Sequence, residues 1–510
     1  MSVCKRSGPR GAKSSSSGRR VAAGSSGRLQ PIGLIVCLTF GCNAVLAGCT
    51  GGDTVKLTVA ELQDPETCNE CHTAHFQEWS GSMHAYASTD PVFRAMNRRG
   101  QEETGGALGS FCVNCHAPLA LRLGLTQDGL NLDEVPAHLQ GITCYFCHNI
   151  QDVAGDHNNP IELAMDTTMR GGIRDPAPSQ AHEAAYSAWM DSRQPDSAKA
   201  CGSCHDIVLP SPPAPAAVEL ERTFKEWRGS IFTKTGLTCS VCHMDQARTP
   251  TPIAEAPGVK VRPGYPHSHA FPGVDVALEP FPEQQQQRML IERELDSTLR
   301  VVRICLTRLR KIFVELENQA AGHRWPSGAS QDRRAWVEVI AYAKGQVIWQ
   351  TGVVQEGQSV TSLSDPDLWL FRDEALGADG KEVHMFWEVA EIREHTIAAP
   401  ITADQTLPEF FNNHALRTFP SMGVLPERPD LVTARVRMRP MGLEVLDDLI
   451  ASGHLDPSIR AAMPTYDLLP RRERGSLVTA QWTPELAADP ATGRMDKIDM
   501  IPAECVVRQP

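Results

Sequence analysis

The sequence predicts an α + β protein of several domains, in which an irregular, mainly helical half is followed by a β-sandwich-like C-terminal half. Three observations support this fold class. The 510 residues exceed one ordinary domain, and 41% apolar with 22% charged residues exclude a mostly disordered chain. Five copies of one cysteine-histidine string fall in the first half, where Gly and Pro interrupt every periodic run. Beyond a proline-rich stretch, runs with the alternating pattern of strands appear.

The first 48 residues resemble a bacterial export signal. They hold seven Lys or Arg and no acidic residue, and an apolar run over about 32–47 follows. The run ends in Leu-Ala-Gly-Cys49, which resembles the lipobox in which the cysteine is acylated. We therefore predict a lipoprotein signal peptide over 1–48, lipidation at Cys49 and an N-terminal linker over 49–66. A plain signal peptide cut elsewhere and an uncut anchor are the alternatives.

Removal of this leader would make the protein more acidic. The formal net charge of −12 becomes −19, because 42 basic residues then stand against 61 acidic ones. Such a composition suggests no basic patch for nucleic acid, so no nucleic-acid partner is predicted. Export with a lipid anchor predicts a periplasmic or outer-membrane-associated lipoprotein of a Gram-negative-type bacterium, tethered to a membrane surface without spanning it.

Ten of the sixteen cysteines form five pairs of one spacing, and a histidine directly follows each pair. The pairs are Cys68/Cys71, Cys112/Cys115, Cys144/Cys147, Cys201/Cys204 and Cys239/Cys242, and the histidines are His72, His116, His148, His205 and His243. In Cys-x-x-Cys-His, the two thiols add to the vinyl groups of one porphyrin and the imidazole binds its iron. We therefore predict five covalently attached haem c groups. Zinc sites usually join two such pairs, and disulfides need no histidine.

The five strings lie close together in the chain. They span residues 68–243, which leaves about 35 residues for each haem. So little protein for each cofactor predicts that the haems supply much of the core and lie near enough to one another to conduct electrons. We assign residues 67–249 to a pentahaem domain of short helices and loops.

One heptapeptide occurs twice in this domain. Residues 76–82 and 224–230 match at five of seven positions, and two residues later His84 stands in the first copy and Phe232 in the second. A helix that packs an aromatic face beside a haem is one interpretation. A duplicated haem module, in which His84 is a distal ligand that the second copy has lost, is the other.

Bis-histidine haems each need a second imidazole, and twelve histidines remain outside the strings. We predict these distal iron ligands: His84, His157, His182, His269 and His323. Other histidines and methionine ligation stay open, with these candidates: His75, His138, His384, His395, His414, His454, Met83, Met96 and Met244.

Local patterns guide the choice of distal ligands. His157 lies in a loop, where a loop-capping role is the alternative, and His182 begins a predicted helix over 181–189. The prolines of residues 266–272 predict an extended segment whose two histidines point in opposite directions, and we choose His269. His323 lies in a turn able to reach back to the haem domain.

The remainder of the chain carries no haem string. Residues 250–285 hold eight prolines and read as an extended arm or linker, and residues 286–510 read as a β-rich domain. The elements expected there are a helix over 283–295, β-like runs over 301–317 and 336–349 with a turn at Lys344-Gly345, a strand over 431–438 and a helix near 443–452. Cys305 and Cys505 either pair or stay buried. A scaffold or a docking module is the favoured role.

The haem half resembles a known family. The five strings, residues 78–84 and residues 170–182 together resemble the multihaem cytochromes c related to cytochrome c-554, of the cytochrome c-552/4 type. The resemblance covers about residues 68–272 and is specific at the strings. It implies stacked haem pairs, mainly bis-histidine ligation and electron transfer.

The C-terminal half adds to this resemblance and also departs from it. The His323 turn followed by residues 333–336 resembles the strand-rich C-terminal domain of some multihaem cytochromes. Five strings in place of four, and about 220 further residues, are departures from the family pattern. They leave the partner and any open haem undefined.

The function predicted from the sequence is electron relay. We expect an exported, lipid-anchored pentahaem cytochrome c that passes single electrons between redox partner proteins at the cell envelope, with a membrane respiratory complex among the candidates. An acidic surface suits partners with basic docking patches. No catalytic residue is assigned, and a carrier is favoured over a catalyst. The alternatives are a haem oxidoreductase acting on a small nitrogen or sulfur compound at one five-coordinate iron, and a docking subunit of a respiratory complex.

Overall fold

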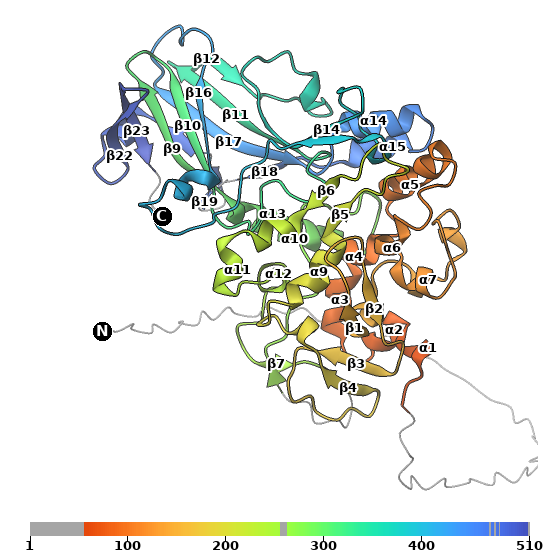
Figure 1. Ribbon diagram of the computed structural model, residues 1–510. Helices are drawn as coiled ribbons and strands as arrows, with labels where there is room; N and C mark the ends of the chain where they lie inside the picture. Colours follow the sequence, from red (N-terminus) through yellow and green to blue (C-terminus); the bar gives the residue numbers. More distant parts are fainter. Residues whose placement is uncertain (1–55, 256–262, 469–470, 474–475, 479, 508–510) are drawn as a thin grey trace, which may run out of the picture. The chain divides into compact units, whose positions relative to one another are not determined.

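The computed structural model describes residues 56–255, 263–468, 471–473, 476–478 and 480–507 (Figure 1). The predicted leader, the lipidation site Cys49 and residues 49–55 of the predicted linker lie outside these ranges, as does the 256–262 part of the proline-rich arm. Within the described ranges, no helix combines the length and the apolar character that crossing a membrane requires.

The first half is built of short helices. They are α1 Val59–Leu62, α2 Pro65–Asn69, α3 Thr73–Ser80, α4 Met83–Tyr86, α5 Pro91–Glu103, α6 Val113–His116, α7 Pro118–Arg122, α8 Cys144–His148, α9 Ser197–His205, α10 Thr223–Arg228, α11 Ile231–Thr235 and α12 Cys239–His243. The last four haem-binding strings end helices α6, α8, α9 and α12, so each places its two cysteines one helical turn apart, as predicted. Asp64 and Asp90 cap α2 and α5, each directly before a proline at the first helical position.

Short strands lie between these helices, which the sequence did not predict. They are β1 Ile150–Val153, β2 Ile161–Leu163, β3 Thr168–Gly171, β4 Glu183–Tyr186, β5 Asp206–Val208, β6 Glu219–Arg222, β7 Thr251–Pro252 and β8 Pro263–Gly264, paired in four two-stranded sheets. The helix predicted over 181–189 is wrong, because β4 pairs with β3 there and His182 precedes the strand. Pairing with a distant segment overrides the weak helix preference of an alanine-containing run.

The second half opens with helix α13 Gln284–Thr298, which confirms the helix predicted there. Antiparallel strands follow in two sheets. One has the order β16-β10-β9-β23-β22, with β9 Leu299–Thr307, β10 Ile312–Asn318, β16 His414–Phe419, β22 Gly493–Ile498 and β23 Ile501–Val507. The other has the order β12-β11-β17-β18 with β13 and β21 beside it, and contains β11 Arg334–Ala343, β12 Gln346–Thr351, β13 Trp369–Phe371, β17 Leu431–Arg439, β18 Tyr466–Leu468 and β21 Ala480–Trp482.

Smaller elements complete this half. They are β14 Glu374–Leu376, β15 Glu391–Arg393, β19 Arg471–Glu473, β20 Ser476–Val478, α14 Leu443–Ala451, α15 Pro457–Ala462 and α16 Pro484–Ala488. The run predicted over 301–317 is the β9–β10 hairpin, and Lys344-Gly345 turns β11 into β12 with φ of 53° and 75°. The predicted strand over 431–438 and helix over 443–452 are confirmed as β17 and α14.

The two large sheets share one hydrophobic core. Every second residue of the central strands is buried in a single cluster, for example Val337 and Val339 on β11 and Val432, Ala434 and Val436 on β17. Residues of β9 and β10 complete the same cluster from the other sheet. The alternation that predicted these strands therefore reports the faces that meet in the core.

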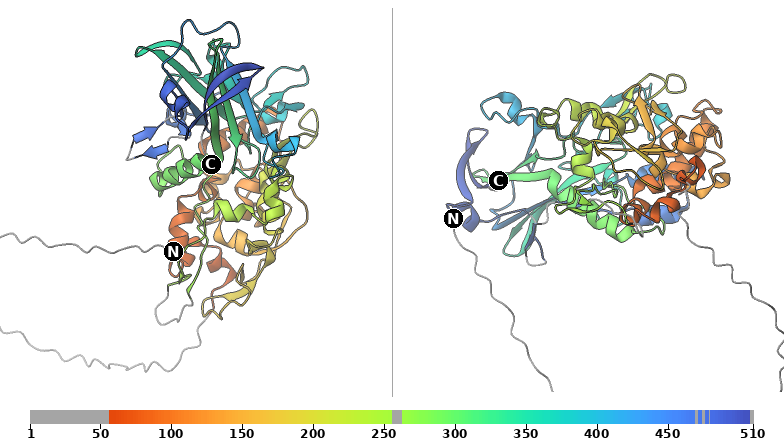
Figure 2. Two further views of the ribbon diagram at one scale, coloured as in Figure 1. Left: turned by 90° about the vertical axis from the view of Figure 1, so that its left-hand side faces the viewer. Right: turned by 90° about the horizontal axis from the view of Figure 1, so that it is seen from below.

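The helical and β-rich halves also pack against each other. Val92 and Ala95 of α5 share a buried cluster with Leu443 and Leu446 of α14 and with Trp387. Figures 1 and 2 show the helical half, coloured red to yellow-green, at one end of the described part of the chain. The two large sheets, coloured green to blue, lie at the other end. The domain boundaries at 249 and 285 stay predictions.

Candidate haem-binding site

The five haem-binding strings line one cavity. All fifteen of their cysteines and histidines contribute to a cavity of about 1940 Å³. Pockets for single small molecules usually measure roughly 300–1,000 Å³. The helical half correspondingly has several small buried clusters around this space instead of one continuous core. The cavity therefore suits several cofactors in mutual contact.

The strings meet through their thiols. The thiol of Cys144 lies beside that of Cys68, the thiol of Cys204 beside that of Cys115, and the thiol of Cys239 beside that of Cys201, close enough for each pair to influence the partner's ionisation. The first string thus lies beside the third, the second beside the fourth, and the fourth beside the fifth. Burial raises the pKa of Cys112 and Cys147 to about 12, so that their thiols stay protonated at neutral pH.

Four histidines of the strings each face a histidine from elsewhere in the chain. The ring centroids are 6.5 Å apart for His72–His182, 6.3 Å for His84–His205, 6.2 Å for His148–His269 and 6.4 Å for His243–His323. An imidazole nitrogen binds a metal ion at about 2 Å. Two such bonds, together with the distance from each nitrogen to the centre of its ring, add up to the centroid separations seen here. The four gaps therefore fit a metal ion held between two imidazoles.

Hydrogen bonds leave one nitrogen of these rings available. Seven of the histidines discussed have Nδ1 2.6–3.0 Å from a backbone carbonyl oxygen: His72, His116, His148, His182, His243, His269 and His323. Metal-binding histidines commonly donate their second N–H in this way, which fixes the ring and leaves Nε2 for the metal. Within the described residues, no group of three or more His, Cys, Asp or Glu side chains is arranged to hold a metal ion by itself.

Burial favours the neutral form of four of these histidines. It lowers the pKa of His84 to about 3, and those of His205 and His323 to about 4. Burial also lowers the pKa of His269 well below its ordinary value. Neutral imidazole is the form that binds iron, so the site favours the ligand-competent state at neutral pH.

The two histidines of the extended segment around residue 269 make different contacts. His267 has both ring nitrogens engaged, with Nδ1 2.7 Å from the Met244 carbonyl oxygen and Nε2 3.2 Å from Ser192 Oγ. His269 has only Nδ1 engaged and its ring faces His148. The structure therefore favours His269 over His267 as the ligand.

His116 differs from the other four string histidines. Its ring stacks on Phe93 with centroids 4.1 Å apart and planes 4° apart, and its Nδ1 lies 3.0 Å from the Ala87 carbonyl oxygen. Among the described residues, no second histidine ring faces it as in the other four pairs. Sequence reasoning missed both this difference and Phe93, because no local pattern connects residues 93 and 116.

His157 is the fifth predicted distal ligand, and the structure does not bring it to a string histidine. It does not line the cavity, and its half-exposed ring lies 3.0 Å from Asp156 Oδ1. This placement agrees with the alternative of a loop-capping histidine. His75 lies in the cavity, with its ring 4.6 Å from that of His269, too close for a metal ion between the two rings.

Two comparisons with known proteins match the chain. The family described as "Cytochrome c554 and c-prime" matches residues 67–149, which hold the first three strings. The chain is similar to the crystal structure of a penta-heme cytochrome c552 from Thermochromatium tepidum, with a TM-score of 0.53 and 18% identity, over 81% of this chain and 99% of that chain. At this identity the similarity concerns the fold. No curated protein matches the chain.

Proposed function

We propose that this chain, a multihaem cytochrome c related to cytochrome c554, relays single electrons through five covalently bound haems. Its class is an electron-transfer haem protein with haem c. The number of haems, their axial ligands, the location and the partners are parts of the proposal.

One observation carries the proposal: the four facing histidine pairs lie in a single cavity that all five strings line. Each bound haem iron supplies one reversible electron transfer, and two imidazoles stabilise both oxidation states. The string cysteines hold the porphyrin edges, and His182, His269, His84 and His323 complete the pairs with the string histidines. Because all five strings line this one cavity, electrons would pass between neighbouring haems over short distances.

The surroundings of this relay are proposed from the sequence. The leader, Cys49 and the acidic mature composition support an exported lipoprotein at the cell envelope, with redox partners that present basic patches. We infer that the two C-terminal sheets form a sandwich-like scaffold, since they share one core and pack on the helical half.

The test is a mass measurement combined with a spectroscopic redox titration. We expect five haem masses above the processed polypeptide, at least four low-spin haems and reversible reduction at low potentials typical of bis-histidine ligation. Fewer haems, or haems that fail to exchange electrons with one another on rapid partial reduction, would contradict the relay.

A second candidate function rests on His116. A haem held by Cys112 and Cys115 would have one imidazole from this string and no facing histidine among the described residues. An iron with one protein ligand can bind a small molecule, so reduction or oxidation of a small nitrogen compound becomes the candidate activity. The duplicated-module interpretation instead placed the lost ligand at Phe232.

Electron paramagnetic resonance separates the two candidates. A high-spin signal from about one fifth of the iron, removed by nitric oxide or hydroxylamine, supports the catalytic candidate. Entirely low-spin iron that ignores both compounds would exclude it and leave the relay intact.

A further inference from the structure

The repeated heptapeptide has the same local structure in both places. Residues 76–82 end helix α3 and residues 224–230 end helix α10. In each copy the serine Oγ donates to the carbonyl oxygen of the tryptophan three residues earlier, at 2.7 Å, and the same serine caps the next helix, α4 or α11. The duplication is therefore one of structure as well as of sequence.

The tryptophan of each copy is anchored to the segment that precedes a haem-binding string. Trp79 Nε1 donates to the Ile142 carbonyl oxygen, and Trp227 Nε1 donates to that of Leu237, each at 2.8 Å. These acceptors stand two residues before the third and the fifth string, respectively. Both acceptor segments read glycine, Ile or Leu, threonine and cysteine, and both glycines have positive φ.

The glutamate of the first copy holds the segment that faces the third string. Glu78 Oε2 accepts the backbone N–H of His269 at 2.8 Å. The ring of His269 faces His148, the histidine of the third string. Trp79 is hydrogen bonded to the segment that directly precedes this same string. Two neighbouring residues of helix α3 thus bind the two chain segments that carry His148 and His269.

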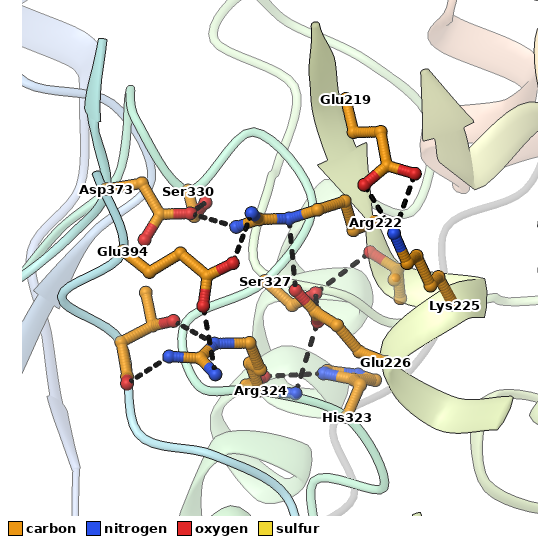
Figure 3. A network of polar contacts seen from close by, with 12 residues as sticks. Glu219, Arg222, Lys225, Glu226, His323, Arg324, Ser327, Ser330, Asp373 and Glu394 are labelled. Carbon is orange, nitrogen blue, oxygen red and sulfur yellow. Dashed lines mark hydrogen bonds and ion pairs between the residues drawn. The ribbon is translucent and has the colours of Figure 1, made fainter. Parts of the chain in front are cut away.

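The glutamate of the second copy does the same for the fifth string. Glu226 Oε2 accepts the backbone N–H of Arg324 at 3.2 Å and the Ser327 hydroxyl at 2.6 Å (Figure 3). Arg324 follows His323, whose ring faces His243 of the fifth string. The Glu226 side chain is 10% exposed, so these bonds act where water competes little.

We propose that Glu78 and Glu226 are positioning residues that hold His269 and His323 opposite the strings anchored by Trp79 and Trp227. Each copy of the Glu-Trp pair therefore sets the distance between two facing imidazole rings. The inference rests on the proposed bis-histidine ligation.

A tether of this kind is needed because both facing histidines are remote from their strings. His269 belongs to the proline-rich arm and His323 to a turn of the β-rich half. A carboxylate that accepts backbone N–H bonds forms charge-assisted hydrogen bonds, which are stronger than neutral ones. Loss of such an outer partner commonly weakens metal binding roughly 10- to 100-fold.

Further contacts hold the turn beside Glu226. Thr223 Oγ1 lies 2.9 Å from Ser327 Oγ and accepts the backbone N–H of Gly328 at 3.0 Å. Arg222 pairs with Asp373 and Glu394, each at 2.6 Å (Figure 3). Strand β6 and the start of helix α10, which directly precede the second heptapeptide, therefore bind the β-rich half around the His323 turn.

The experiment compares leucine and glutamine variants of both glutamates in the haem-loaded full chain. E78L and E226L remove the acceptor oxygen, whereas E78Q and E226Q keep one. E219L is the matched control, because Glu219 begins β6 four residues before α10 and its carboxylate pairs at the surface with Lys225. The readouts are haem mass, high-spin iron by electron paramagnetic resonance, and midpoint potentials.

Each leucine variant should convert about one fifth of the iron to a high-spin form. The equilibrium between the bound and the dissociated facing histidine should shift roughly 10- to 100-fold towards dissociation. Added imidazole should restore low-spin iron in both. The double variant should open two haems, while the glutamine variants and E219L should retain the wild-type spectrum and all haems. Added imidazole that restores the spectrum also shows that the variant is folded.

Two results would overturn the proposal. One is a wild-type spectrum in both leucine variants, and the other is damage by glutamine equal to that by leucine. In the wild-type protein, hydrogen exchange at the His269 and Arg324 amides should be slow, and fast exchange at both would overturn it without any variant. None of these results depends on electron relay, so a failed relay and a failed positioning role are distinguishable.

Discussion

Cys305 on β9 and Cys505 on β23 face each other in register across neighbouring strands and form a disulfide. The bond closes a loop of 200 residues that includes most of both C-terminal sheets. It resolves the choice between a disulfide and two buried thiols that the sequence left open, and it agrees with the proposed export to an oxidising compartment.

Removing this disulfide should destabilise the protein without changing its haem spectrum. A cross-link over so long a loop restricts the unfolded chain, and its loss typically costs about 2–5 kcal/mol. The C305A/C505A variant should therefore show a lower free energy of unfolding in denaturant titration. Neither cysteine lines the haem-binding cavity, so the low-spin spectrum should persist. A changed spectrum would indicate coupling between the two halves that the contacts do not predict.

Replacing His182 should open one haem. In H182A, His72 loses the ring that faces it at 6.5 Å, and the iron between them should become high-spin. H267A is the matched control, since both nitrogens of His267 are hydrogen bonded elsewhere. Magnetic circular dichroism or electron paramagnetic resonance measures the difference. Equal spectra for H182A and wild type would remove His182 from the ligand set.

The interface between the two halves should depend on Trp387. Its ring is buried against α5 and α14, and its Nε1 donates to Glu103 Oε2 at 2.9 Å. W387A should lower the free energy of unfolding by about 3–5 kcal/mol through the cavity left behind. W387F, which keeps most of the apolar contact, should lose about 1 kcal/mol. Similar stabilities for W387A and W387F would show that the ring contributes little to the contact between the halves.

The covalent part of the site could be predicted because its chemistry is local in sequence. Two thiols and an imidazole within five residues identify each haem attachment without any knowledge of the fold. His84 was found from the repeat and His269 from the extended proline-rich segment, which both restrict the backbone locally. The partner of each histidine could not be predicted, because pairs such as His72–His182 depend on contacts between remote segments.

The fold was predictable to a similar degree. The long strands of the β-rich half follow from alternation over eight or more residues, as in β11 and β17. The strands of the helical half have two to four residues, too few to show a period, and the pairing of β3 with β4 even replaced a predicted helix. His157 looked like a ligand only because a loop histidine near a haem string and a loop-capping one have the same sequence pattern.

Asp166 and Arg170 should give the protein a measurable sensitivity to acid. The Arg170 guanidinium donates two hydrogen bonds of 2.9 Å to the Asp166 carboxylate, and these bonds lower the pKa of Asp166 to about 2. An aspartate in the unfolded chain has a pKa of about 3.9, so the folded state favours ionisation. The resulting stability is fully present above the unfolded pKa and is lost as the pH falls through the folded pKa.

The comparison of wild type with D166N over pH 2–6 isolates this contribution. D166N lacks the charge at every pH, so the wild type should be more stable by on the order of 1 kcal/mol above pH 5, a value discounted for solvent screening because the Asp166 side chain is 45% exposed. The difference should shrink steadily towards pH 2. Since the Arg170 carbonyl oxygen lies 2.6 Å from His148 Nδ1, the variant should also loosen that ring. A stability difference that stays constant with pH would show that Asp166 acts as a hydrogen-bond acceptor and not through its charge.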